Sequence, residues 1–337
     1  MHTTKKKSPL TLYNNRMETF VRERRKFFER PEDPRPMRLT SRNIELLRNI
    51  ARLRLASATQ LAALDGGSAQ NVSRALLALF ENGYVERPVA QVASRLLYEG
   101  SRPTIYALTR KGAGLLRKHG EDVRRRLLDG IDSERGAGWR FIEHTVSIAE
   151  FWVALELATR NRSDLRVLER NEILEDAPKS NCDRLVKLEA SIRMGGVLKR
   201  NAVVPDALFG LRMNDAKDNF FMLEIDRGEM PVERYRNTQR TYFAKKMQTY
   251  YEANRQRRHV HDLGIENFRV LTVTTDASRI DRMLTSLDRL TNGKGSNLFL
   301  FADFETLGAS NPLEAMWLTG KGERTQIINN AAAGASA

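Results

Sequence analysis

Three short amphipathic segments, each preceded by a residue that favours a helix start, are the feature that most constrains the fold. Across residues 39–83, apolar side chains recur at intervals of three and four, the spacing of a helix with one buried face. Thr40 or Ser41 can cap the first segment, Ser57 the second and Ser68 the third, because their hydroxyls accept hydrogen bonds from unpaired N–H groups of the first turn. The pattern predicts three consecutive helices.

Two runs rich in β-forming residues follow the third helix. That helix is expected to end at Asn82-Gly83, since glycine tolerates the left-handed backbone of a helix terminus. Residues 84–89 and 104–108 then have the composition of two strands, joined by a loop rich in Arg and Gln. Three helices followed by such a pair predict a winged helix-turn-helix domain over residues 39–120.

A winged helix of this kind binds duplex DNA by placing its third helix in the major groove. The outward side chains of that helix are of types that bond base edges or phosphates: Gln70, Asn71, Ser73 and Arg74. Three arginines in or beside the wing are expected over the DNA backbone or minor groove: Arg87, Arg95 and Arg102. The alternative is that this face docks a protein or forms a homodimer.

The charge of the chain favours DNA. Its formal net charge is +14 and its pI is near 10, and such an excess is typical of proteins that bind a polyanion. Residues 1–38 carry eleven basic against five acidic residues and are expected to form a flexible arm that contacts phosphates. The absence of any apolar run of 18 residues argues against a membrane partner and predicts a cytoplasmic location. Because Cys182 is the only cysteine, a disulfide framework and a cysteine zinc site are excluded.

A second domain is expected after a Gly-, Asp- and Ser-containing linker at 121–138. An apolar helix at 139–159 opens it, and the tail 321–337 is rich in alanine and expected to be disordered. The remaining segments predict strands at 165–168, 185–194, 202–211, 220–226, 268–274 and 298–302, with helices at 232–258 and 277–290. The expected class is α/β (α+β overall), with a central mixed sheet flanked by helices over residues 139–320.

Three carboxylates are expected to converge in this sheet. Residues 220–223 form a continuous apolar run typical of a buried strand, and Glu224 and Asp226 follow it two residues apart, so their side chains point to the same face. Asp206 follows Pro205 in another apolar run, and pairing of the two strands would bring it to the same place. Such a group could hold Mg²⁺, which prefers oxygen ligands. Solvated acids at a strand end are the alternative.

These residues resemble known motifs. Pro205-Asp206, an eighteen-residue gap and Glu224-Ile225-Asp226 resemble the PD-(D/E)XK nuclease core. The whole arrangement over residues 39–302 resembles the replication-relaxation family of plasmid and mobile-element proteins. The nuclease resemblance implies that Asp206 and Glu224 bind Mg²⁺, with Glu150 or Glu143 as a further acid from the first helix.

The third motif position departs from the nuclease pattern, because Asp226 stands where lysine is expected. A lysine ammonium lowers the pKa of the attacking water and neutralises developing charge, and a carboxylate does neither. Lys245 or Lys246 of the following helix could reach back to supply the cation. Alternatively, a second Mg²⁺ could use Asp226 as a ligand.

Three hypotheses of function follow. The first is a DNA-binding protein of a plasmid or mobile genetic element that controls replication, relaxation or mobilisation, with double-stranded DNA and other replication or mobilisation proteins as partners. The second is an active Mg²⁺-dependent endonuclease or nickase that uses the three acids with Lys245 or Lys246. The third is a transcription regulator or docking subunit whose α/β domain has no catalytic role.

Overall fold

The computed structural model describes residues 27–92, 102–121, 130–131, 138–175, 177, 186–194, 196–214, 217–234 and 242–328. The chain divides into two compact units, Met1–Glu150 and Phe151–Ala337, and the division falls within helix α8 (Trp139–Thr159). Most of the expected arm 1–38 and linker 121–138, and residues 329–337 of the expected tail, lie outside the described residues. The predicted domain boundaries therefore stay predictions.

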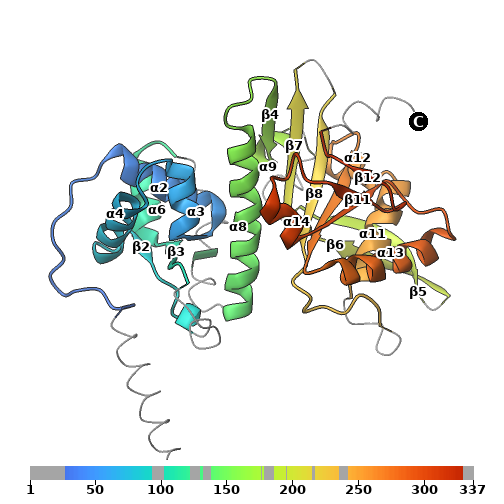
Figure 1. The fold of residues 1–337 in the computed structure, drawn as a ribbon, viewed down its shortest axis with the longest axis horizontal. Helices are drawn as coiled ribbons and strands as arrows, with labels where there is room; N and C mark the ends of the chain where they lie inside the picture. The colour runs from blue at the N-terminus through green and yellow to red at the C-terminus, as the bar shows by residue number, and fades with distance from the viewer. Residues whose placement is uncertain are drawn as a thin grey trace, which may run out of the picture. The chain divides into compact units, whose positions relative to one another are not determined.

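The first unit begins with the three predicted helices, α2 (Ser41–Leu53), α3 (Ala58–Asp65) and α4 (Ala69–Glu81) (Figure 1). The Thr40 side chain caps α2, with the Asn43 side chain bonded back to the Thr40 N–H. Ser57 and Gln60 form the same reciprocal cap at α3. Each cap satisfies N–H groups that have no partner within the helix, so these helix starts are encoded locally.

The wing of the first unit is a three-stranded antiparallel sheet in the order β1-β3-β2. Its strands are β1 (Leu55–Ser57), β2 (Val85–Glu86) and β3 (Ile105–Leu108), and the short helices η1 (Val89–Gln91) and α6 (Arg110–Lys118) follow β2 and β3. Only two strands were predicted here. The third, β1, is too short for its sequence to show strand periodicity, and its pairing with β3 defines it.

The second unit is built on a seven-stranded mixed sheet in the order β12-β11-β10-β9-β8-β7-β4. Strands β8, β9 and β10 are parallel, and the other pairs are antiparallel. The strands are β4 (Leu165–Glu169), β7 (Ala207–Met213), β8 (Asn219–Ile225), β9 (Arg269–Thr274), β10 (Phe299–Asp303), β11 (Trp317–Thr319) and β12 (Arg324–Thr325). The predicted α/β class with a central mixed sheet is confirmed.

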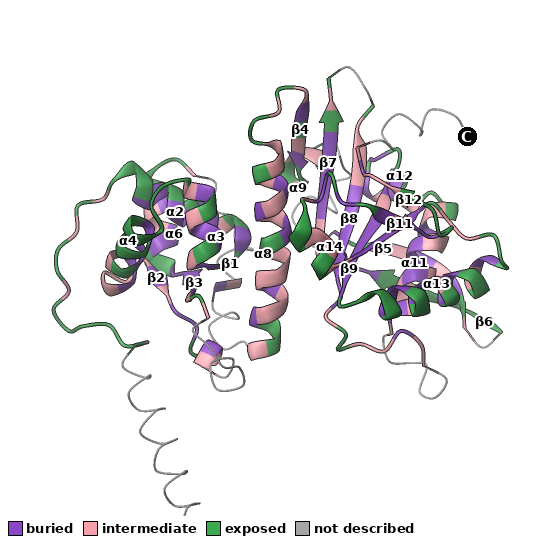
Figure 2. Cartoon of the chain, viewed as in Figure 1, coloured by how far each residue is buried: buried purple, intermediate pink, exposed green. Residues whose placement is uncertain are grey.

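Helices cover both faces of this sheet. Helices α11 (Phe243–Arg255) and α13 (Ala277–Thr291) pack on one face, where Met222 of β8 shares a core with Tyr250 and Met283. The C-terminal part of α8 packs on the other face, where the Trp152 ring lies edge-on to Phe209. Figure 2 shows the buried residues that run along β7 and β8 as a result. Short helices complete the unit: α9 (Arg170–Ile173), α12 (Arg258–Leu263) and α14 (Phe304–Ala309).

Two segments differ from the predicted layout. The expected strand at 202–211 is broken near Pro205: its first part belongs to β6 (Val197–Val203), which pairs with β5 (Leu188–Met194) in a separate two-stranded ribbon packed on α11. The long helix expected from residue 232 begins at Phe243 instead. In both cases the apolar pattern identified an element but not its boundary. At Pro205 the reason is that proline lacks the backbone donor that a sheet needs.

Candidate functional site

The site lies where β7 begins and β8 ends. The antiparallel register ends with Ala207 opposite Leu223, so Asp206 and Glu224 lie directly beyond the last pair. The Asp206 N–H donates to the Leu223 carbonyl at 2.9 Å, and its Oδ2 accepts the Ile225 N–H at 2.7 Å. These two bonds hold the Asp206 carboxylate against the end of β8.

Glu224 is the centre of the site and is only 2 % exposed. Its Oε2 accepts a hydrogen bond from the Lys246 Nζ at 2.6 Å, and its Oε1 accepts one from the Tyr250 hydroxyl at 2.7 Å. Lys246 and Tyr250 lie one turn apart on α11, so they reach the sheet from the same helix face. A buried carboxylate therefore has a cation and a neutral donor on opposite oxygens.

Burial dominates the electrostatics of this group. It raises the pKa of Glu224 to about 7, the charge of Lys246 opposes the shift, and the charge of Asp206 adds to it. Burial by itself lowers the pKa of Lys246, but the Glu224 and Asp206 carboxylates outweigh it and the net pKa is raised. The pKa of Tyr250 is well above its usual value, first because of burial and then because of the Glu224 charge. Glu224 can thus exchange a proton near neutral pH while Lys246 keeps its charge.

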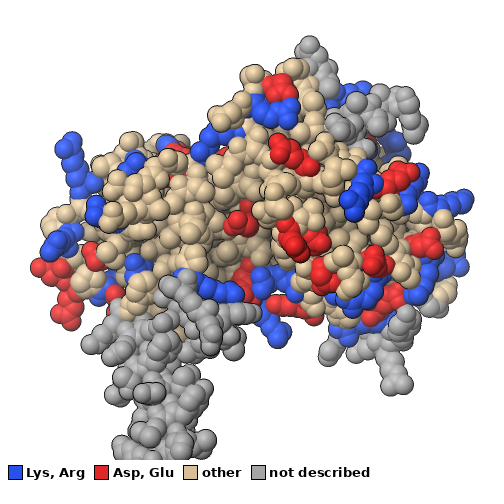
Figure 3. Space-filling view, in the orientation of Figure 1, with Lys and Arg blue, Asp and Glu red and all other residues tan. Residues whose placement is uncertain are grey.

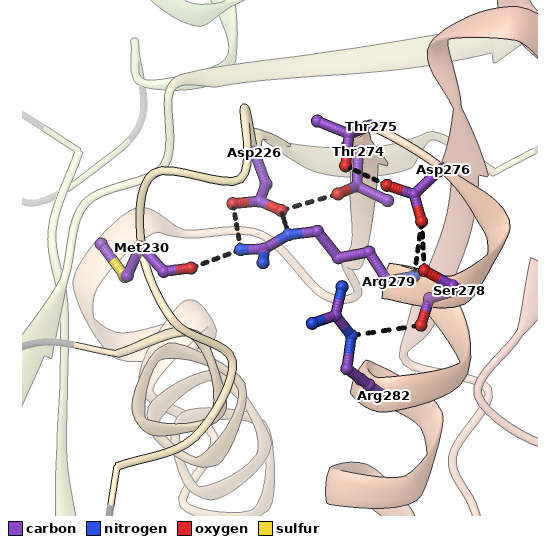
Figure 4. Close-up of polar contacts among 8 residues, drawn as sticks. All are labelled: Asp226, Met230, Thr274, Thr275, Asp276, Ser278, Arg279 and Arg282. Carbon is purple, nitrogen blue, oxygen red and sulfur yellow. Dashed lines mark hydrogen bonds and ion pairs between the residues drawn. The ribbon is translucent and has the colours of Figure 1, made fainter.

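Asp226 faces the same side but has different partners (Figure 4). The Arg279 guanidinium of α13 binds it through two nitrogens, Nε to Oδ2 and Nη2 to Oδ1, the latter at 2.8 Å. The Thr274 hydroxyl donates to Oδ2 at 2.6 Å, and Arg279 also donates to the Met230 carbonyl. Both side chains of this ion pair are nearly inaccessible to solvent. Arg279 thus supplies a cation at this end of the sheet and ties β8 to α13.

The three acids where β7 begins and β8 ends therefore lie near one another, as their spacing predicts, and the charges of all three raise the pKa of Lys246. Lys246, and not the neighbouring Lys245, is the lysine that bonds Glu224. The sequence offers no signal for Arg279. The position of Tyr250 is detectable in principle, since it stands four residues after Lys246 on the same helix and is therefore on the same helix face.

The fit of this group to Mg²⁺ is partial. Asp206 and Glu224 would hold the ion, which in proteins is bound by one or two carboxylates together with waters and substrate phosphates. The Thr272 hydroxyl, which stands opposite Glu224 on β9, is buried without a hydrogen-bond partner and is a further oxygen at the site. Within the described residues, however, no three His, Cys, Asp or Glu side chains are grouped so that they could hold a metal.

Two expected metal ligands have other partners. Asp226 is bound by Arg279, as described above. Glu150 belongs to the first compact unit, where its carboxylate accepts a hydrogen bond from the Gln60 side chain at 2.7 Å. Both acids therefore already accept hydrogen bonds from other side chains. A direct role for either in metal binding stays a prediction.

In the first unit, the outer face of α4 carries the predicted DNA-reading residues. All four side chains are exposed: Gln70, Asn71, Ser73 and Arg74. The inner face of the same helix is buried through Val72, Leu76 and Leu79. The first two turns of the helix thus present polar side chains to solvent, and contact of these side chains with DNA stays a prediction.

The predicted arginines of the wing behave differently. Arg87 is buried, and its guanidinium carbon lies 4.1 Å from the centre of the Phe27 ring and 4.2 Å from that of Phe80. The expected position over DNA is therefore wrong for Arg87, because its planar guanidinium stacks on aromatic faces in the core. Arg102 forms an ion pair with Glu143 at 3.3 Å. Arg95 lies outside the described residues.

Comparisons with known proteins agree with the sequence resemblance. A family model described as replication-relaxation matches residues 47–267, which is more than half of the chain. No curated protein matches the chain significantly. A solved structure of a Lactococcus lactis ZitR mutant is similar at 17% identity over 43% of this chain and 97% of that chain, but its TM-score of 0.20 supports no conclusion. In the described part of the chain, no helix is long and apolar enough to cross a membrane.

Proposed function

Since this chain belongs to the replication-relaxation family, we propose that it is a DNA-binding protein of a plasmid or mobile genetic element that acts in the control of replication, relaxation or mobilisation. The observation that carries the proposal is the exposed polar face of α4, on the third helix of a winged helix-turn-helix in a chain of net charge +14. A helix presented in this way matches the width of the major groove. Its partner is double-stranded DNA.

Two substitutions on α4 test this proposal. Arg74→Ala is expected to weaken binding to duplex DNA and, if Arg74 contacts a phosphate, to reduce the slope of log affinity against log salt by about 0.9. Asn71→Ala is expected to change the preference among sequences, since asparagine bonds adenine edges. Lys118→Ala, at an exposed position in the last turn of α6, is the matched control. If Arg74→Ala and Lys118→Ala bind alike, the winged helix does not hold DNA through α4.

A second candidate function is cleavage of DNA by the acids of the second unit. The observation that favours it is the Lys246 ammonium, which lies 2.6 Å from the Glu224 carboxylate and supplies the cation missing at the third motif position. Mg²⁺ held by Asp206 and Glu224 would polarise the scissile phosphate. Lys246 and the buried Arg279 would then lie beside the negative charge that develops during attack by water.

Incubation with supercoiled plasmid and Mg²⁺ or Mn²⁺ tests this second function. Cleavage is expected to produce nicked circles, and Asp206→Asn, Glu224→Gln and Lys246→Met are each expected to abolish them. Lys245→Met is the matched control, because it removes the adjacent lysine of the same helix that does not bond Glu224. Plasmid that stays supercoiled while the protein binds it would leave DNA binding as the function. A protein partner that co-purifies in the absence of any DNA binding would favour the docking-subunit hypothesis.

A further inference from the structure

The ribbon formed by β5 and β6 has one covered and one open strand. Its inner side packs on α11 through the buried Leu188, Ala190 and Ile192. The outer edge of β5 is closed by Gln256, the residue that follows α11, whose side chain exchanges hydrogen bonds with both backbone groups of Ser191. By contrast, the first four residues of β6 are exposed, as Figure 2 shows in green.

The open strand combines cations with apolar side chains. Val197 and Leu198 are 58 % and 65 % exposed at the end of the ribbon. Lys199 and Arg200 follow them directly, and Arg193 pairs with Leu198 across the ribbon. Because successive side chains of a strand point to opposite faces, each face of the ribbon end carries one exposed apolar side chain.

The ribbon also has a local excess of positive charge. Residues 186–203 contain four basic side chains and one acid, Glu189, which is paired with both Lys187 and Arg200. Among the described residues, neither Arg193 nor Lys199 forms an ion pair. Elsewhere on the face of this unit seen in Figure 3, Lys and Arg alternate with Asp and Glu. The excess on the ribbon therefore differs from the mixed charges of the face seen in Figure 3.

We propose that the β5–β6 ribbon is a second contact with duplex DNA, in which Arg193, Lys199 and Arg200 bind phosphates and the apolar end of the ribbon enters the minor groove. This inference rests on the proposed DNA-binding function and assigns the second unit a part in it. Cations complement the phosphate backbone. Apolar side chains flanked by Arg or Lys are the kind that proteins insert between base steps of the minor groove. The contact reads shape and charge, not base sequence.

Two variants of the full-length protein separate the two kinds of contact. Binding to a fluorescent duplex of mixed sequence is measured by anisotropy at several salt concentrations. Lys199→Ala/Arg200→Ala is expected to lower the slope of log affinity against log salt by about 1.8, since each phosphate contact contributes about 0.9. Leu198→Ser is expected to weaken binding on the order of tenfold with an unchanged slope, because an apolar contact releases no counterions. Both changes are at exposed positions and are expected to leave the thermal midpoint unchanged.

Lys217→Ala is the control, since this lysine is in the same unit, is 86 % exposed, and forms a long ion pair with Glu266 at 3.9 Å. The inference is overturned if Lys199→Ala/Arg200→Ala binds DNA like Lys217→Ala while Arg74→Ala binds less tightly; the winged-helix proposal then still stands. If the ribbon variants lose affinity and Arg74→Ala does not, the ribbon is the DNA contact and the winged helix is not. The inference is also overturned if a ribbon variant keeps its DNA binding but has a different molecular mass in solution, measured by light scattering. That result would identify the surface as a contact between copies of the chain.

Discussion

Replacing Glu224 with glutamine should remove a specific part of the pH dependence of stability. Burial raises the pKa of Glu224 from 4.5 to about 7 in the folded protein. The folded state thus binds this proton more tightly than the unfolded state does. The resulting stability is fully present below about pH 4.5 and is lost as the pH rises through 7. Glu224→Gln, which stays neutral at every pH, does not lose it.

The size of the effect follows from the pKa difference. One pKa unit corresponds to about 1.4 kcal/mol, so the full shift amounts to about 3 kcal/mol between pH 4.5 and the region above 7. Glu224 is buried, so solvent screening does not reduce this value. The wild-type protein should therefore lose about 3 kcal/mol of unfolding free energy relative to Glu224→Gln across this range.

Urea denaturation followed by tryptophan fluorescence measures the difference. Trp152 and Trp317 lie in the second unit and Trp139 in the first, so a Trp139→Phe background confines the signal to the unit that holds Glu224. All other titrating groups are shared by the two proteins and cancel in the difference. Glu266→Gln, at a side chain that is 80 % exposed, serves as the control.

The reasoning would be refuted if the difference in unfolding free energy between the wild-type protein and Glu224→Gln stayed constant between pH 4.5 and 7.5. A wild-type protein that gains stability relative to Glu224→Gln as the pH rises would refute it more strongly. That result would mean that the hydrogen bonds from Lys246 and Tyr250 outweigh burial and hold Glu224 ionised. The site would then contain a permanent ion pair and no group that titrates near neutral pH.

Two further predictions concern packing. Arg279→Met leaves the buried Asp226 without its bidentate partner and is expected to lower the free energy of unfolding by about 3–5 kcal/mol in urea denaturation. The double variant Arg279→Met/Asp226→Asn should recover part of this loss. If it recovers nothing, the loss does not come from an unpaired charge. Gly112→Ala should lower the thermal midpoint, because the added Cβ would lie 2.3 Å from the Tyr84 carbonyl oxygen, although alanine favours helices by about 1 kcal/mol. Gly114→Ala in the same helix, where the added Cβ meets nothing within 4 Å, should raise or preserve the midpoint, and equal effects of the two changes would contradict the close packing of α6 on Tyr84.

Much of the fold could be predicted from short stretches of sequence. The caps at Thr40 and Ser57 and the helical spacing that follows them are interactions among residues three or four apart, so each helix start is visible without knowledge of the rest of the chain. The apolar run before Glu224 likewise indicates a buried strand, and strand alternation places Glu224 and Asp226 on one face. These features depend on local backbone geometry alone.

The partners of the site residues could not be predicted in this way. Lys245 and Lys246 are neighbouring residues of the same type, but their side chains point about 100° apart around α11. Only the rotation of that helix on the sheet decides which of the two reaches Glu224.

The sequence by itself determined the winged helix, the α/β class and the spacing of the acids, because each is encoded in residues close together along the chain. Only the tertiary structure decided that Arg279 forms an ion pair with Asp226, that Arg87 is buried among aromatic rings, and that β5 and β6 form a ribbon separate from the central sheet. Each of these depends on contacts between segments tens of residues apart. The periodicity of apolar residues does not predict such contacts, because it indicates only which face of an element is buried and not which residues pack on that face.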